Sequence, residues 1–385
     1  MIRLFDNLSR TWVSPSGYNE LSFAYLNRSA NEPIRKIREV LEHWFFRYPE
    51  SGKVDLKERF RSRKEHNHSS ALFELWLHEV LCRLGCRVTV HPPLAHTDRT
   101  PDFLVKSPSG LDFYLEAIQT TGASDDEANA QARLNTLYDS LNSVKSPNFF
   151  LYVDVKGLPR TPVPGRDIKR SLEQKLSHLR LEVIDHFLDS RRLDLLPRWT
   201  YEHDGLRITC FPMPKPLELR GVPGVRTLGI KTFGGKIDSE GSIKDAVVKK
   251  AKHYGILDHP LVVAVNVTDL FLNERDVLHA LYGSFHGWPD AELLNDERGI
   301  WGNAANPKWT RVSAVLAVLK LRSDKLVVPV GLHHHPRPRL PYSGELSRLA
   351  QTTITNNRLR TNDGLTVASI LGLDPDFPEE NSNQN

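Results

Sequence analysis

The spacing of apolar side chains predicts two helices in the first quarter of the chain. Pro33 opens one of them, because proline fits the first turn of a helix and the apolar residues after it recur at intervals of three and four. A second helix is predicted over residues 69–84, where Ser69 or Ser70 provides the N-cap and Gly85 ends the helix. The apolar stripe of this second helix consists of Leu72, Phe73, Trp76, Leu77, Val80 and Leu84.

Short apolar runs after Gly85 predict three strands, at residues 87–90, 102–105 and 111–119. The turn residues at 108–110 join the last two runs as a hairpin. Side chains alternate along a strand, so Phe113, Leu115 and Ala117 would face a core and Glu116 would face the other way.

Helices and strands alternate through the rest of the chain, which indicates an α/β protein. The predicted helices cover residues 125–144, 167–187, 242–254 and 274–282; the predicted strands cover residues 148–155, 200–211, 227–232, 261–267, 312–321 and 326–332. Prolines and glycines between residues 212 and 224 mark a domain boundary. We therefore predict a mostly helical amino-terminal region at 1–65, one α/β domain at 66–215, a second α/β domain at 216–373, and a disordered polar tail at 374–385.

Positive charge gathers at the amino-terminal end of the sequence. Residues 1–65 contain 13 Lys and Arg against 9 Asp and Glu, which accounts for the whole net charge of +4. The run ends with Arg61, Arg63 and Lys64, which we predict to contact nucleic-acid phosphates. A second basic group at the end of a predicted helix, formed by Lys249, Lys250 and Lys252, is predicted to do the same. A solvated helix end is the other interpretation of each group.

The composition excludes several classes of protein. With 39% hydrophobic and 25% charged residues, the chain of 385 residues is typical of globular proteins rather than disordered ones. No apolar run approaches the length of a membrane span, and the amino terminus lacks a signal-peptide pattern. The chain has 3 cysteines; Cys82 and Cys86 lie one helical turn apart without a second pair to complete a zinc site, and we expect all three to be reduced core thiols. We expect a cytoplasmic protein without membrane association.

Three carboxylates lie on a predicted helix and on two predicted strands that follow it. Glu74 lies on the helix at 69–84, Asp102 follows Pro101 at the start of a strand, and Glu116 lies on the next strand. If the two strands pair as a hairpin, Asp102 and Glu116 lie side by side. Mg²⁺ prefers oxygen ligands and is commonly held by one or two carboxylates together with a substrate phosphate. The pattern therefore favours a site for Mg²⁺ or Mn²⁺ and phosphodiester hydrolysis.

The order of helix, strand, hairpin, helix and strand over residues 66–155 resembles the core of the PD-(D/E)XK nucleases, the restriction-endonuclease-like superfamily. Pro101-Asp102 matches the first half of the motif, Glu116 matches its second acidic residue, and Glu74 matches the acidic position of the first helix. The resemblance implies a restriction-endonuclease-like mixed sheet core flanked by helices. It also implies that Asp102 and Glu116 hold the metal, with Glu74 completing the shell directly or through water.

The lysine of the family motif is missing from its usual place. That place, two residues after Glu116, holds Ile118. Gln119 follows and is our predicted stand-in, brought to the same face by a bulge. The resemblance leaves other sources open, because some members take the lysine from the next helix; this chain offers Gln131, Lys145 and Lys156 in the following segment.

The leading hypothesis is a metal-dependent nuclease that hydrolyses DNA, an endonuclease or exonuclease used in defence against foreign DNA. The alternative, prompted by Ile118, is a nuclease fold without catalysis that binds nucleic acid or a protein partner; a homo-oligomer is a further expectation. A third option is different chemistry around His333, His334 and His335, although adjacent histidines on a strand point to alternate faces and favour a structural role.

Overall fold

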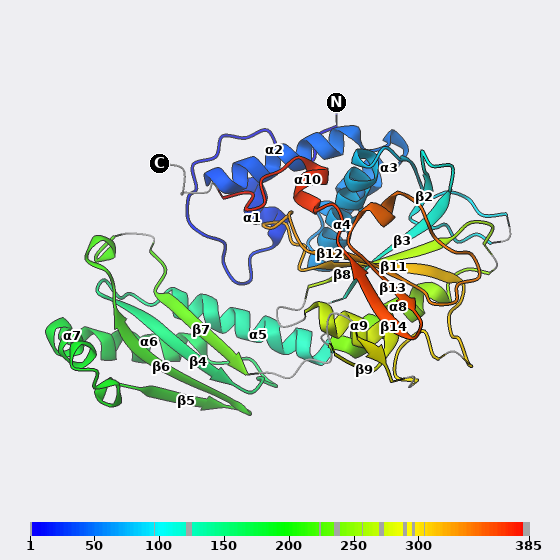
Figure 1. Ribbon diagram of the computed structural model, residues 1–385. Coiled ribbons are helices and arrows are strands. Elements are labelled where there is room, and N and C mark those ends of the chain that lie inside the picture. The colour runs from blue at the N-terminus through cyan, green and yellow to red at the C-terminus, as the bar shows by residue number, and fades with distance from the viewer. Residues whose placement is uncertain are drawn as a thin grey trace, which may run out of the picture. The chain divides into compact units, whose positions relative to one another are not determined.

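The computed structural model describes residues 2–95, 97–120, 125–222, 225–234, 239–255, 257–268, 273–287, 291–294, 297–303 and 305–379 (Figure 1). The chain divides into two compact units. Unit 1 comprises residues 1–13, 21–122 and 238–385, and unit 2 comprises residues 14–20 and 123–237. The larger part of unit 2, residues 123–237, is therefore inserted between two segments of unit 1.

Unit 1 is a mixed α/β structure built on one large sheet (Figure 1). Its strands in spatial order, as far as the described residues show, are β1 (Arg87–Val90), β2 (Phe103–Lys106), β3 (Phe113–Thr120), β8 (Leu261–Val267), β11 (Val312–Leu319), β12 (Val330–His334), β13 (Gln351–Thr355), β14 (Arg358–Asn362), β10 (Glu292–Leu293) and β9 (Phe285–His286). β8 is parallel to both of its neighbours, β3 and β11, whereas β1, β2 and β3 are antiparallel. The predicted strand at 261–267 and the predicted hairpin are confirmed.

Helices cover both faces of this sheet. One face packs with α2 (Glu32–Arg47), α3 (Glu50–Phe60), α4 (Glu65–Arg83) and α10 (Val367–Leu371), and α1 (Ser22–Arg28) lies with them; the other face packs with α8 (Ser239–Ala251) and α9 (Glu274–Tyr282). Alternate residues of β8 enter different cores: Val262 joins the α4 side and Val263 joins the α8 side. A strand buried on both faces needs an apolar sequence, which β8 has from Leu261 to Val265. Its polar residue, Asn266, is buried and exchanges hydrogen bonds with the backbone of Leu321.

Unit 2 has its own core between a four-stranded sheet and three helices. The strand order is β5 (Trp199–His203), β6 (Leu206–Pro214), β4 (Phe149–Lys156) and β7 (Leu228–Gly234), and the helices are α5 (Asp125–Asn142), α6 (Gly165–Ser177) and α7 (Leu181–Asp189). β5 and β6 form a hairpin whose two turn residues, Asp204 and Gly205, have φ of 43° and 83°. Positive φ at both positions is what a two-residue hairpin turn requires. The single helix predicted at 167–187 is wrong, because α6 and α7 are separate helices.

The structure divides the chain differently from the sequence-based boundaries. The Pro- and Gly-containing segment at 212–224 is not a domain boundary, because it lies inside unit 2 between β6 and β7, and both strands pair with β4. The amino-terminal region is not a domain of its own, because α2 and α3 share a hydrophobic core with α4. In the predicted tail, Phe377 packs against that same core, and residues 380–385 lie outside the described residues.

No helix in the described part of the chain has both the length and the apolar character of a membrane span.

Candidate active site

The β2–β3 hairpin aligns two of the predicted carboxylates. Phe103 of β2 pairs with Leu115 of β3, so Asp102, the residue before β2, comes level with Glu116. Asp102 is fixed in place because its Oδ2 accepts a hydrogen bond from the backbone N–H of Ala117 at 2.7 Å. The side chain of Glu116 is 1% exposed, and that of Asp102 is 18% exposed. One carboxylate is thus buried, and its neighbour reaches solvent.

Lys250 links the two carboxylates. It belongs to α8, which covers the Glu116 face of β3. Its Nζ lies 3.5 Å from Asp102 Oδ2 and forms a closer ion pair with Glu116 Oε2. The Lys250 side chain is 18% exposed, so the ammonium group is held at the edge of the interior. An acidic pair and a lysine therefore form one compact cluster.

Tyr254, just after α8, completes the surroundings of Glu116. Its hydroxyl donates to Glu116 Oε1, and it also lies 2.9 Å from the carbonyl oxygen of Thr100. Both carboxylate oxygens of Glu116 therefore have a donor from the α8 region. These two contacts offset the cost of burying the Glu116 carboxylate, which is large unless the group is paired and hydrogen-bonded.

The cluster shifts the pKa values of its members. Burial raises the pKa of Glu116 to about 7, and the charge of Asp102 adds to the rise, whereas Lys250 and Tyr254 oppose it. Burial by itself would lower the pKa of Lys250, but the charges of Asp102 and Glu116 outweigh it and raise that pKa. Lys250 is therefore a cation at neutral pH, and Glu116 is a carboxyl poised to gain or lose a proton. Such poised groups are frequent in active sites.

Glu74 lies outside this cluster of contacts. Its two carboxylate oxygens accept hydrogen bonds from Nη1 and Nη2 of Arg59, each at 2.6 Å. Burial raises the pKa of Glu74, Arg59 opposes that rise, and the charge of Asp102 adds to it. The structure thus brings Glu74 within electrostatic range of Asp102 but engages both of its oxygens with an arginine. Arg59 was absent from the predicted site residues.

The predicted stand-in for the lysine, Gln119, is wrong. β3 pairs with β8 in regular register from Tyr114 to Thr120, so no bulge turns Gln119 toward Glu116. Gln119 points to the opposite face of the sheet, and its Oε1 is buried without a partner among the described residues. Ile118 lies on the Glu116 face and packs against the α8-side core. The other candidates for this role, Gln131, Lys145 and Lys156, all belong to unit 2.

The residues predicted to bind nucleic acid separate into three groups. Lys250 belongs to the acidic cluster. Arg61 is engaged within the fold, because its Nη2 lies 2.5 Å from Asp6 Oδ1 and its guanidinium group lies 5.0 Å from the ring centre of Phe23. The exposed members are Arg63, Lys64, Lys249 and Lys252, and the last of these lies 5.6 Å from the ring centre of Trp309.

Two of the three adjacent histidines form hydrogen bonds with separate partners. His334 Nε2 lies 2.9 Å from Gln351 Oε1, and His335 lies 2.8 Å from the Lys308 carbonyl. His333 is 1% exposed, and its Nδ1 has no hydrogen-bond partner in the described part of the chain. This arrangement favours the structural role over a shared metal ion.

Because His333 is buried, we expect part of the free energy of unfolding to be lost as the pH falls. Burial, with the charge of His334, lowers its pKa to about 3, against about 6.5 in an unfolded chain. Below pH 6.5 the ring of His333 is therefore protonated in the unfolded state but stays neutral in the folded state, so stability falls as the pH falls. Between pH 8 and pH 5 we expect the loss from this residue to be about 2 kcal/mol. Urea unfolding of wild type and His333→Leu at both pH values measures it; identical pH dependence in the two proteins would contradict this assignment.

The donor set suits a divalent cation bound together with a substrate. Asp102 and Glu116 supply two carboxylates around one position, the number with which Mg²⁺ is commonly held when phosphate oxygens complete its shell. No three His, Cys, Asp or Glu side chains of the described residues form a group able to hold a metal by themselves. The Lys250 ammonium already lies between the two carboxylates, so a metal ion would compete with it there.

Comparison with known proteins finds no family model, no curated protein and no solved structure that matches this chain.

Lys250 and Tyr254 are the two residues whose place in the site the sequence analysis missed. They are four positions apart in the helix predicted at 242–254, a spacing that places two residues on one side of a helix. In the structure α8 ends at Ala251, and Tyr254 follows it. The inserted unit hid the connection, because it separates β3 from α8 by more than a hundred residues of sequence. A lysine and a tyrosine at this spacing before the apolar strand 261–267 were the available signal.

Proposed function

We propose that the protein is a metal-dependent nuclease of the PD-(D/E)XK type, acting on DNA. The order of elements in unit 1 supports this: with unit 2 left out, α4, β1, β2, β3, α8 and β8 follow one another as a helix, three antiparallel strands, a helix and a parallel strand. That order is the one that the resemblance implies for the restriction-endonuclease-like core. The sequence analysis, however, took the helix and the last strand from residues 125–155, which belong to unit 2, so α8 and β8 replace them.

One observation carries the proposal: Lys250 contacts both Asp102 and Glu116. The motif requires two acidic residues and a lysine at one place, and Ile118 left the lysine unaccounted for. α8 is the first helix after β3 within unit 1, so it corresponds to the helix from which some members of the superfamily take this lysine. We infer that Lys250 takes the part of the motif's lysine, although it lies elsewhere in the sequence than the motif places that residue.

The chemistry assigns a part to each side chain. Asp102 and Glu116 would hold Mg²⁺ or Mn²⁺, which supplies charge stabilisation at the scissile phosphate and a more acidic bound water. Lys250, whose ammonium group lies against both carboxylates, would act on the attacking water or on a phosphate oxygen. Tyr254 would keep Glu116 oriented through its hydrogen bond to Oε1. Arg59 neutralises Glu74 and thereby limits the negative charge beside the DNA. The exposed cations Arg63, Lys64, Lys249 and Lys252 would contact DNA phosphates.

Cleavage of plasmid and linear DNA tests the proposal. We expect hydrolysis with Mg²⁺ or Mn²⁺, none with EDTA, and loss of at least about 100-fold in rate for Asp102→Asn, since the carboxylate charge at the metal position is removed. Asp112→Asn is the matched control, because Asp112 lies just before β3 and outside the cluster. Equal cleavage by wild type and Asp102→Asn would reject this site. Cytoplasmic defence against foreign DNA is the biological role that we attach to the activity.

A second candidate function is a DNA-binding module without catalysis. The Lys250–Glu116 ion pair favours it, because an ammonium group that already neutralises Glu116 weakens the attraction for a divalent cation. This candidate predicts DNA binding that is unchanged by EDTA, together with no cleavage at any Mg²⁺ or Mn²⁺ concentration. The same plasmid assay, combined with filter binding, separates the two.

A further inference from the structure

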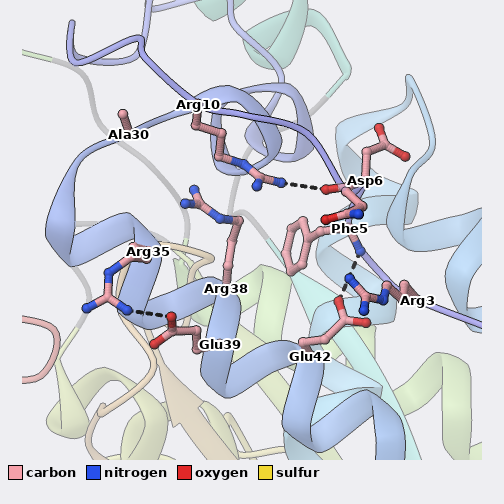
Figure 2. A pocket seen from close by; sticks show the side chains of 10 residues that line it. Arg3, Phe5, Asp6, Arg10, Ala30, Arg35, Arg38, Glu39 and Glu42 are labelled. Carbon is pink, nitrogen blue, oxygen red and sulfur yellow. Dashed lines mark hydrogen bonds and ion pairs between the residues drawn. The ribbon is translucent and has the colours of Figure 1, made fainter.

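A cavity in the amino-terminal part of unit 1 is lined by an unusual number of arginines. Figure 2 shows it between the chain before α1 and the helix α2, with Arg10 and Arg38 projecting into it and Arg35 at its edge. Its volume is about 440 Å³, within the range of small-molecule binding sites. It contains none of the residues of the Asp102–Glu116–Lys250 cluster.

The acidic side chains around the cavity already have partners. Glu39 forms an ion pair with Arg35, and Asp6 forms one with Arg61, which approaches from outside the cavity lining. Glu42 accepts hydrogen bonds from the backbone N–H groups of Leu4 and Phe5, at 3.0–3.1 Å. The charge of Glu39 still acts on Arg38 and opposes the lowering of its pKa, but within the described residues the ion pairs of Glu39 and Asp6 are with Arg35 and Arg61 and not with the two inner arginines.

Arg38 and Arg10 have no carboxylate partner among the described residues. Arg38 is 8% exposed, and its Nη1 donates to the carbonyl oxygens of Leu26 and Ser29 at 2.8 and 2.7 Å. Within the described part of the chain, its Nε and Nη2 make no hydrogen bond. Among the residues that the structure describes, Arg10 donates only to carbonyl oxygens, those of Asp6, Leu8 and Asn27. Burial lowers the pKa of Arg38 to about 10, and the charge of Arg10 adds to this.

A buried guanidinium group without a counter-ion is costly, and an anion that enters the cavity would remove the cost. The planar fork of arginine suits the oxygens of a phosphate, which it binds through paired hydrogen bonds. A phosphate group fills only part of the space, and Phe5 and Ala30 add an apolar wall for an organic group.

We propose that this cavity binds a phosphate monoester, held by Arg38 and Arg10. Two sources share this chemistry: a free nucleoside monophosphate and the 5′-phosphate of a DNA strand.

Binding is tested with the full chain by calorimetry and by thermal unfolding. The probes are inorganic phosphate, a nucleoside 5′-monophosphate, and a short single-stranded oligonucleotide with and without its 5′-phosphate, all with EDTA at constant ionic strength. We expect saturable binding of the monophosphate and a higher unfolding temperature in its presence, because a ligand that binds only the folded state stabilises it. Arg38→Met should weaken binding about tenfold or more, the scale of a lost charge-assisted hydrogen bond.

Ala30→Glu keeps the test informative if Arg38→Met fails to fold. Ala30 lines the cavity, so a glutamate there supplies the missing counter-ion. We expect this variant to unfold at a higher temperature than wild type without phosphate and to lose the phosphate-dependent rise; Ala30→Gln should retain the rise. Preference for the 5′-phosphorylated strand over its unphosphorylated form, with competition by the monophosphate, would support the site with DNA as the source, and binding of the monophosphate alone would support it with a free nucleotide. Absence of saturable binding by every probe, or binding unchanged in Ala30→Glu, would overturn the proposal.

Discussion

Lys250→Met is expected to reduce the single-turnover rate of DNA cleavage by about 10²- to 10⁴-fold, the range for a side chain that handles a proton in the transition state. The ammonium group contacts both Asp102 and Glu116, and methionine preserves the length of the side chain while removing the charge. Metal binding should not weaken, because the ammonium group no longer competes for Glu116. Quenched-flow cleavage of a labelled duplex measures the rate, and calorimetry with Mn²⁺ measures the metal affinity.

Lys249→Met is the matched control for this prediction. Lys249 is the preceding residue of α8 and is exposed, whereas Lys250 is mostly buried. We expect Lys249→Met to change DNA affinity slightly and to leave the cleavage rate within about threefold of wild type, since a phosphate contact by an exposed lysine is a small, salt-dependent contribution. Equal losses in the two variants would assign Lys250 to general DNA attraction instead of the active site.

Arg59→Leu is expected to lower the free energy of unfolding by about 3–5 kcal/mol, the cost of breaking a buried pair and leaving one charge without a partner. Glu74 makes both of its side-chain hydrogen bonds with Arg59, and its side chain is 9% exposed. Urea unfolding at pH 8 measures the loss. The loss should shrink toward pH 5, because burial raises the pKa of Glu74 and the variant then folds with a protonated, neutral carboxyl group.

The double variant Arg59→Leu/Glu74→Leu separates the buried charge from lost packing. Removing both partners of a buried pair is often nearly neutral, so we expect the double variant to recover most of the stability. A double variant as unstable as Arg59→Leu would show that packing of the arginine, and not the unpaired carboxylate, holds α3 against α4.

The sequence predicted local elements well where the pattern was strong. The strand Leu261–Val267 and the helix Glu274–Tyr282 have the predicted bounds. Pro101-Asp102, Glu116 and the turn between them sufficed to predict that Asp102 and Glu116 lie level in a hairpin. Each of these conclusions depends on residues that are close in sequence, where periodicity and turn chemistry act directly.

The domain boundaries could not be predicted from local sequence patterns, because they depend on contacts between residues far apart in the sequence. A Pro- and Gly-containing loop looks the same between two strands of one sheet as between two domains, so the segment at 212–224 was misread. The insertion of unit 2 between β3 and α8 placed Lys250 far along the chain from Glu116, and the motif-based search near Ile118 selected Gln119 instead. Arg59 was not predicted as a partner of Glu74, because the two residues meet only through the packing of α3 on α4.

Single-turnover cleavage of a supercoiled plasmid by wild type and Glu116→Gln, each with Mg²⁺, decides whether the Asp102–Glu116 pair is a catalytic site. Glutamine keeps the shape of Glu116 and can still accept a hydrogen bond from Tyr254, but it removes the charge that pairs with Lys250 and that, under our proposal, would bind a metal ion. We expect Mg²⁺-dependent cleavage by wild type and a loss of at least about 1,000-fold in Glu116→Gln, the upper part of the range for removing one preorganised charge-stabilising group. Cleavage by Glu116→Gln at the wild-type rate would contradict this expectation.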